Sequence, residues 1–206
     1  MIENPQAVVE RLIEFQKLVR AVVIKSHSLA GQFEVSRSTA ADTIYKIDTD
    51  VDPILESFCE EWSKQTRRVL VAEGLEDEAG NEVVGGKAFP LGSNPEDAKI
   101  RVIVDPIDGT RGIMYDKRPA WALAGVAPNR GVNTYLHEIE VAVMTELPTS
   151  KMGYADVLWA IRGHGAHGRR DDLRTGQSSP LTLAPSRSEK IDHGFAMIAN
   201  FFPGTK

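Results

Sequence analysis

Two aspartates three residues apart, Asp105 and Asp108, follow the apolar run 102–104 and stand just before a glycine–threonine pair. The run predicts a strand, and the aspartates then fall at its end, in a tight turn that Pro106 stiffens by holding φ at about −65°. Gly109 lets the backbone approach a ligand, and the amides after it could face an anion if a helix starts there. Carboxylates bind hard metal ions and amides bind phosphate, so this segment predicts a metal-assisted phosphate site.

Two more carboxylates stand where apolar segments give way to polar ones. Asp48 follows the extended stretch 43–47, and Glu73 follows the apolar stretch 69–72. If these stretches are strands of one sheet that end on the same side, Asp48, Glu73 and Asp105 come together. Carboxylates gathered in this way repel phosphate, so we expect the site to be inactive without bound metal.

The elements that must position these residues are helical first and strand-rich later. Apolar residues recur at helical spacing from Pro5 to about residue 28, and a second helix is expected to start near Asp52-Pro53, with Cys59 packed on its buried side. Strands are expected at 69–72, 100–104, 121–127, 139–147, 157–161 and 195–202, with a loop over 30–42, a hairpin or irregular segment over 74–99, a short helix from about Thr110, and tight turns at Gly163, Gly165 and Gly168. This order, with little alternation of strand and helix, predicts an α+β fold.

The composition is that of an ordinary globular protein, with 42% hydrophobic and 26% charged residues among 206. The formal net charge of −5 and the pI of about 5.6 argue against a general nucleic-acid binder, so metal ions or local amides must attract a phosphate substrate. A single cysteine excludes an internal disulfide. The N-terminus does not resemble a signal peptide and no apolar run is long enough for a membrane span, so we expect a cytoplasmic protein that binds neither membranes nor nucleic acid polymers.

The segment 105–110, Asp-Pro-Ile-Asp-Gly-Thr, resembles the signature of the inositol monophosphatase family, within the wider superfamily of lithium-sensitive, magnesium-dependent phosphatases. Asp42 and Asp48 resemble that family's aspartate pair before the second helix, and Glu73 falls where its first metal-binding glutamate stands. The pair 151–152 followed by 160–168 is similar to its hairpin after the signature. The resemblance implies a layered α/β/α sandwich of the inositol monophosphatase and sugar phosphatase type. It also implies a homodimer, inhibition by lithium, and hydrolysis of a small phosphomonoester by a metal-activated water with no phosphoenzyme.

The resemblance assigns the metal ligands residue by residue. Glu73, Asp105 and the carbonyl of Ile107 would hold one magnesium, and Asp105 would bridge to a second ion that Asp108 also binds. Two or three ions are expected in all. The family has a second glutamate where this chain has Gly74, and Glu76 is a nearby substitute.

The resemblance also assigns the residues that act on the substrate. Thr110 and Asp48 would orient the attacking water and are the predicted catalytic residues. The amides of Gly109 and Thr110 would hold phosphate oxygens. Arg111 departs from the family pattern, which commonly has a small or polar residue at this place. We include it in the predicted substrate-binding set for its own chemistry, because a guanidinium beside the site could contact a second phosphate or a carboxylate.

The family's remaining aspartate ligand lies in a Trp-Asp motif of a second lobe, and this sequence contains no Trp-Asp pair. We therefore expect an N-terminal metal-binding phosphatase domain over 1–190 and the start of a truncated C-terminal lobe over 191–206, with the second lobe missing or incomplete. A compact variant of the fold is the alternative.

Other functions remain open at this point. If Arg111 binds substrate, a 3′(2′),5′-bisphosphate nucleotidase or a fructose-1,6-bisphosphatase-like activity is favoured; otherwise Arg111 pairs on the helix surface with Asp116 or Glu140. A non-catalytic relative that binds magnesium and a phosphorylated ligand is a further alternative.

Two other motifs are weaker. Asp48-Thr49-Asp50 resembles the nucleophile motif of haloacid-dehalogenase-type phosphatases, in which Asp48 would form a phosphoaspartate, but Pro53 argues against it. His164 and His167 lack the helical spacing of a metal pair and are expected in exposed turns.

Overall fold

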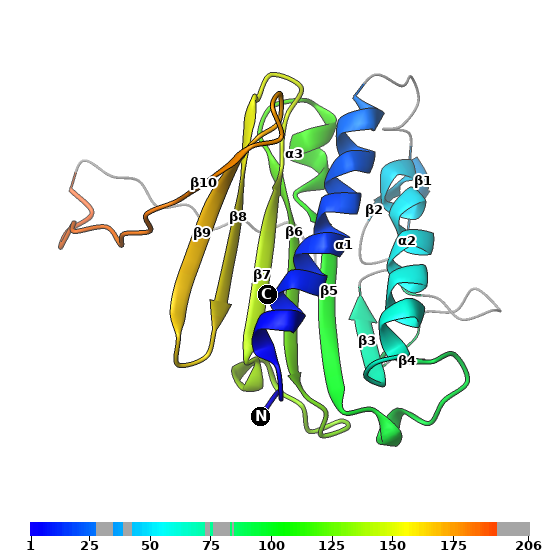
Figure 1. Ribbon diagram of the computed structural model, residues 1–206. Coiled ribbons are helices and arrows are strands. Elements are labelled where there is room, and N and C mark those ends of the chain that lie inside the picture. Colours follow the sequence, from blue (N-terminus) through cyan, green and yellow to red (C-terminus); the bar gives the residue numbers. More distant parts are fainter. Residues whose placement is uncertain (28–34, 39–42, 73–74, 76–82, 84, 193–206) are drawn as a thin grey trace.

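The computed structural model describes residues 1–27, 35–38, 43–72, 75, 83 and 85–192. Within them, one mixed sheet is covered on one face by two long helices (Figure 1). The predicted α+β class is confirmed. The helical layer that would complete a sandwich on the other face is not among the described residues.

In the described part of the chain, the large sheet has eight strands in the order β10-β9-β8-β7-β6-β5-β3-β4. Their bounds are β3 Arg68–Ala72, β4 Lys87–Phe89, β5 Ile100–Asp108, β6 Ala120–Pro128, β7 Val141–Leu147, β8 Tyr154–Ile161, β9 Gly165–Asp172 and β10 Ser178–Pro180. From β5 to β10 each strand pairs antiparallel with the next along the chain, and β4 pairs antiparallel with β3. Among the strands that the structure describes, β3 and β5 are the one pair that runs parallel. Figure 1 shows both of these strands pointing toward the same end of the sheet.

Helix α1, Pro5–Ser26, begins as the sequence predicts. Pro5 stands in the first turn, where a missing N–H costs no hydrogen bond, and the side chain of Asn4 accepts a hydrogen bond from the Ala7 amide. Two of its polar residues are buried against the sheet, where Gln16 Nε2 donates to the Val143 carbonyl and Arg20 Nε to the Glu146 carbonyl. These bonds fix the helix across β7.

Helix α2, Lys46–Ser63, starts earlier than the sequence predicts, and Pro53 lies inside it. A proline in a helix interior costs about 3 kcal/mol. The helix nevertheless continues back from Pro53 because Ile47 and Val51 extend the buried stripe of Leu55 at four-residue spacing, and all three are 2% exposed or less. The burial of these side chains thus outweighs the tendency of Pro53 to begin a helix. Asp48 consequently lies in the first turn of α2, and not directly after a strand.

The packing role predicted for Cys59 is confirmed. The thiol is 1% exposed among the core residues of α2, and burial raises its pKa to about 12.

Several smaller predictions meet different outcomes. In the segment 74–99, expected to be a hairpin or irregular, β4 pairs antiparallel with β3, which precedes the segment, and residues 74, 76–82 and 84 lie outside the described residues. The hairpin expected around 160–168 is present as β8–β9. The prediction of a loop over 30–42 is wrong for residues 35–38, which form strand β1 (Val35–Ser38). This strand pairs antiparallel with β2, Thr43–Tyr45, and the backbone hydrogen bonds of that pairing outweigh the loop preference of its serines. Gly163 and Gly165 have positive φ at the β8–β9 turn, but Gly168 lies within β9 opposite Leu158. The strand predicted at 195–202 and most of the segment 191–206 lie outside the described residues.

Among the described residues, no helix has both the length and the apolar character that a membrane crossing requires.

Arg68, at the start of β3, is completely buried. Its guanidinium carbon lies 3.6 Å from the ring centroid of Trp62, and Nη2 donates to the Thr66 carbonyl. Nε and Nη1 have no hydrogen-bond partner among the described residues. Burial lowers the pKa of this guanidinium to about 9. The side chain therefore carries an incompletely compensated charge in the core.

We expect Arg68→Met to raise the free energy of unfolding by about 1 kcal/mol, because it removes a desolvated charge and two unsatisfied donors while keeping an apolar stem. Chemical denaturation at pH 7 measures the change. Arg67→Met is the matched control, since Arg67 is exposed and contacts Asp97 at the surface. A destabilisation of more than about 1 kcal/mol by Arg68→Met would show that the Trp62 contact outweighs the buried charge.

Candidate functional site

Strands β3 and β5 carry the predicted ligands to the same edge of the sheet. They pair in parallel with Ala72 opposite Val104, so Asp105 and Glu73 are the residues that follow the last paired positions. Glu73 itself, like Asp42, Gly74 and Glu76, lies outside the described residues. The strand directions agree with a shared edge, and the role of Glu73 stays a prediction.

Asp105 and Asp108 lie on the same face of β5, although only two residues stand between them. Asp105 is opposite Leu123 and Asp108 is opposite Trp121, so β5 holds one more residue than β6 between these pairs. Such a β-bulge changes which face the following side chains point to. The predicted tight turn at 105–108 is therefore wrong in form: the strand continues through a bulge, because pairing with β6 persists to Asp108.

A network of hydrogen bonds shapes the bulge. The amide of Ile107 donates to Asp105 Oδ1 over 3.1 Å, and the Ile107 carbonyl accepts from Thr110 Oγ1 over 2.9 Å. The Ile107 side chain is buried in the core, which fixes the bulge to the interior. Gly109 follows with φ 97°, a value that strains any residue with a Cβ. Its carbonyl accepts from the amides of Gly112 and Ile113 to start α3, Thr110–Met114, where the sequence predicts a short helix.

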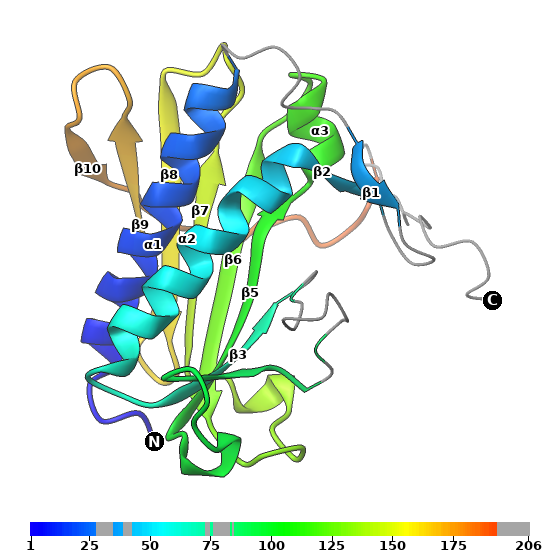
Figure 2. The same ribbon diagram turned by 90° about the vertical axis from the view of Figure 1, so that its right-hand side faces the viewer.

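Thr110 and Asp48 are brought together from elements 62 residues apart. Thr110 Oγ1 lies 3.2 Å from Asp48 Oδ1, and the Thr110 hydroxyl also reaches the Ile107 carbonyl. Asp48 is in the first turn of α2, which Figure 2 shows beside α3 at the upper end of the sheet. One proton cannot be given fully to both acceptors, so when it is donated to Asp48 the hydroxyl can accept a hydrogen bond from a third group.

The donor set suits a hard cation. Asp105, Asp108 and the Ile107 carbonyl supply oxygen ligands within four residues, which is the ligand chemistry of Mg²⁺. Among the residues described here, no three His, Cys, Asp or Glu side chains form a metal-binding group, and a third carboxylate would have to come from outside them. The residues present therefore fit one part of a magnesium centre.

Arg111 lies exposed in the first turn of α3. The two carboxylates considered as its partners bind elsewhere: Asp116 accepts from Ser150, and Glu140 accepts from the amide of Ile2. Hydrogen bonds from Ser150 hold the pKa of Asp116 below its usual range.

Lys117 and Arg118, also exposed, follow α3 and were missed by the sequence reasoning. The signal was a pair of adjacent basic residues close behind the signature.

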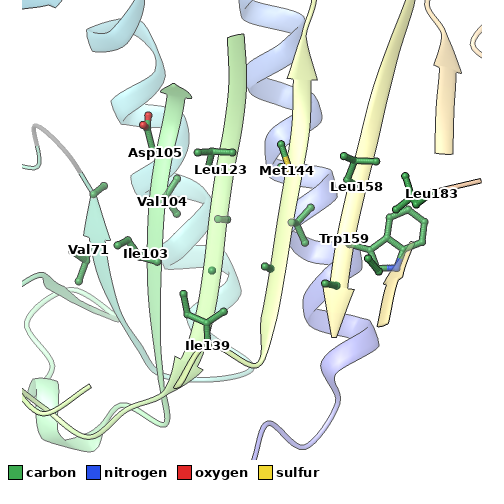
Figure 3. A pocket seen from close by; sticks show the side chains of 17 residues that line it. Val71, Ile103, Val104, Asp105, Leu123, Ile139, Met144, Leu158, Trp159 and Leu183 are labelled. Atoms are coloured by element: carbon green, nitrogen blue, oxygen red, sulfur yellow. The ribbon is translucent and has the colours of Figure 1, made fainter. Parts of the chain in front are cut away.

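An apolar groove of about 770 Å³ runs over the sheet face turned away from α1 and α2 (Figure 3). Figure 3 shows Ile103, Leu123, Met144 and Leu158 along it, with Asp105 at one end. The sequence analysis did not predict that this face of the sheet is apolar. Unbroken apolar runs such as 102–104 were the available signal, because they are typical of strands that are apolar on both faces. Asp105 lines this groove, whereas Asp108, Thr110 and Asp48 are not among its lining residues.

The weaker motifs gain no support. Asp48 and Asp50 belong to α2, whereas the phosphoaspartate reading places Asp48 directly after a strand. His164 lies in the β8–β9 turn and His167 in β9, where its ring stacks 5.8 Å from that of Trp159. Both histidines are exposed, but the turn predicted for His167 is wrong because the hairpin pairs this residue with Trp159.

No protein-family model matches the sequence, and no curated protein sequence matches it either. Similar solved structures include fructose-1,6-bisphosphatase of Leishmania major in holo form, with a TM-score of 0.57 and 14% identity over 87% of this chain and 54% of that chain. The extragenic suppressor protein SuhB of Bartonella henselae has a TM-score of 0.54 and 18% identity over 79% of this chain and 52% of its own. SuhB of Mycobacterium tuberculosis has a TM-score of 0.53 and 16% identity over 90% and 55%.

The chain thus spans about half the length of each of these proteins. At such identities the likeness establishes a shared fold.

Proposed function

We propose that this chain is the N-terminal catalytic part of a magnesium-dependent phosphatase that hydrolyses a small phosphomonoester. The observation that carries the proposal is the Thr110–Asp48 hydrogen bond beside the carboxylates Asp105 and Asp108. A protein that only bound a phosphorylated ligand would not need this pair. The fold shared with a fructose-1,6-bisphosphatase supports the same reaction class.

Two or three Mg²⁺ ions would be held by Asp105, Asp108, the Ile107 carbonyl and Glu73. When bound, magnesium acts as a Lewis acid that lowers the pKa of water and neutralises phosphate charge.

The chain's own residues orient the attacking water. The Thr110 hydroxyl accepts a hydrogen bond from the water while donating its own proton to Asp48, so the water's proton can pass through Thr110 to the Asp48 carboxylate. Gly109 and Thr110 present their amides to the phosphate oxygens. Phosphorus is attacked directly and no phosphoenzyme forms.

Inositol monophosphatase-like activity, lithium inhibition, a homodimer and a cytoplasmic location belong to the same proposal. Bisphosphate nucleotidase or fructose-1,6-bisphosphatase-like activity is the alternative favoured by Arg111.

Phosphate release from inositol 1-phosphate, fructose 1,6-bisphosphate and adenosine 3′,5′-bisphosphate, with and without Mg²⁺, tests the proposal. We expect release that requires Mg²⁺, stops with EDTA and returns when Mg²⁺ is restored. Absence of release from all three, with calorimetric binding of inorganic phosphate in the presence of Mg²⁺, would favour the non-catalytic binding protein.

A further inference from the structure

The turn that follows α3 is tied to the connection between β7 and β8 through the side chain of Asp116. Both oxygens of its carboxylate are used, since Oδ1 accepts from the Ser150 amide and Oδ2 from the Ser150 hydroxyl, each over 2.7 Å. We propose that this Asp116–Ser150 clamp makes Asp116 a positioning residue, which holds α3 so that Thr110 stays within hydrogen-bond distance of Asp48. The inference rests on the proposed function, because it takes Thr110 and Asp48 as the pair that orients the attacking water.

Asp116 has a backbone conformation that its side-chain contacts must maintain. Its φ is 52°, and among the described residues it is the one residue other than glycine with a positive φ. Aspartate enters this left-handed region more easily than most residues with a Cβ, but the conformation still costs free energy. Such a conformation persists where surrounding contacts hold it, and the two hydrogen bonds from Ser150 are contacts of this kind.

Backbone hydrogen bonds connect Asp116 to the start of α3. The Asp116 amide donates to the Ile113 carbonyl over 2.9 Å, and the Ile113 amide donates to the Gly109 carbonyl over 3.3 Å. Gly109 directly precedes Thr110, and the Ile113 side chain is completely buried in the core. A displacement of Asp116 is therefore passed along α3 toward Thr110.

Helix α3 is too short to keep its direction by itself. It has five residues, and isolated helices of fewer than about 12 residues are marginal in water. Its N-terminal end is fixed by the hydrogen bond from Thr110 Oγ1 to the Ile107 carbonyl, and its C-terminal end by the clamp. Loss of the clamp leaves the helix fixed at one end, where it can tilt.

The connection that carries Ser150 is itself anchored. Nε2 of His27, at the end of α1, lies 3.0 Å from the carbonyl oxygen of Pro148. Lys151 Nζ lies 3.6 Å from Asp116 Oδ2, but the lysine is exposed, and an ion pair of this kind contributes little. The clamp thus joins α3 to a connection that α1 also holds, and the two bonds from Ser150 are its main contacts.

The test compares variants that break the clamp with one that keeps it. Asp116→Gly keeps the positive φ and removes both hydrogen bonds, Ser150→Ala removes the bond from the hydroxyl, and Asp116→Asn keeps a partner for each group of Ser150. Asp172→Gly is the matched control. The Asp172 carboxylate also accepts from a backbone amide, that of Arg174, but at the end of β9, which three strands separate from β5.

Three measurements are made on each variant. Steady-state kinetics with Mg²⁺ give kcat and KM for whichever of the three phosphate esters named above is hydrolysed. Thermal unfolding shows whether the variant is folded. Amide hydrogen exchange follows Gly112 and Ile113, whose amides donate to the Gly109 carbonyl, and it does not depend on turnover.

We expect Asp116→Gly to lower kcat about tenfold while KM stays within about twofold, because a displaced Thr110 hydroxyl affects the transition state more than substrate binding. Ser150→Ala should lower kcat by a smaller factor. Asp116→Asn and Asp172→Gly should keep kcat within about twofold of the wild type.

Exchange and the double variant should agree with the kinetics. The Gly112 and Ile113 amides should exchange about tenfold faster in Asp116→Gly than in the wild type, and Asp116→Asn should leave their exchange unchanged. Adding Ser150→Ala to Asp116→Gly should lower kcat no further, because the partner of the hydroxyl is already gone.

Wild-type kcat in a folded Asp116→Gly, a rise of KM without a loss of kcat, or a loss that Asp116→Asn shares in full overturns the inference, while hydrolysis by the wild type upholds the proposed function. If the wild type hydrolyses none of the esters, the proposed function fails, and exchange alone decides whether the clamp holds α3. Equal exchange in Asp116→Gly and the wild type then overturns it. If Asp116→Gly does not fold, Ser150→Ala is judged by the same outcomes.

Discussion

Asp105→Asn is expected to reduce magnesium-dependent phosphate release by about 1,000-fold or more. Asp105 is the proposed bridging ligand, and loss of several kcal/mol of metal-derived stabilisation of the transition state corresponds to a rate loss of this size. The substitution should not unfold the protein, because the asparagine amide oxygen can still accept the hydrogen bond that the carboxylate takes from the Ile107 amide.

Initial rates at saturating substrate across a range of Mg²⁺ concentrations measure this effect, with thermal unfolding as the check on folding. Asp97→Asn is the matched control, since Asp97 lies exposed before the opposite end of β5 and contacts Arg67. Retention of more than a tenth of the activity by Asp105→Asn at any Mg²⁺ concentration would exclude a bridging role.

Thr110→Val is expected to lower kcat by about 100-fold with a much smaller change in KM, as expected for loss of proton transfer in the transition state. Valine keeps the branched shape at the start of α3 but removes the hydroxyl that links the Ile107 carbonyl to Asp48. The bound substrate still meets the same backbone amides, so binding is largely kept.

Thr110→Ser supplies the control, because serine keeps the hydroxyl and should retain activity within about tenfold of the wild type. Steady-state kinetics of both variants separate the two parameters. Equal losses in the serine and valine variants would mean that the methyl packing of Thr110, and not its hydroxyl, matters.

The edge of the sheet could be predicted from the sequence, because the apolar runs before Glu73 and Asp105 each fill a strand and those strands are parallel. The β-bulge between Asp105 and Asp108 could not be predicted from the sequence. It depends on which residue of β6 faces Asp105 and which faces Asp108, and pairing register is a property of two strands together.

The start of α2 was predicted too late in the chain because Pro53 is typical of the first turn of a helix. The burial of Ile47, which extends the helix toward the N-terminus, depends on tertiary packing and is not visible in the local sequence. The position of Arg118 was equally hidden, since only the closed turn onto the Gly112 carbonyl brings it back to α3. The residue types of segment 105–110 thus allow its chemistry to be predicted from the sequence. The distances between this segment and residues remote in the chain, such as Asp48, depend on tertiary packing.

The parallel pairing of β3 with β5 has a consequence for the order in which the molecule assembles. The strands from β5 to β10 are joined by short connections, so their contacts form between neighbours in the chain. The pairing of β5 with β3 and the contact of Thr110 with Asp48 close much longer loops, the latter 62 residues apart. Because long loops cost more entropy to close, we expect the meander to form while Thr110 and Asp48 are still separate, so that the proposed catalytic pair is assembled only after the strands that carry it.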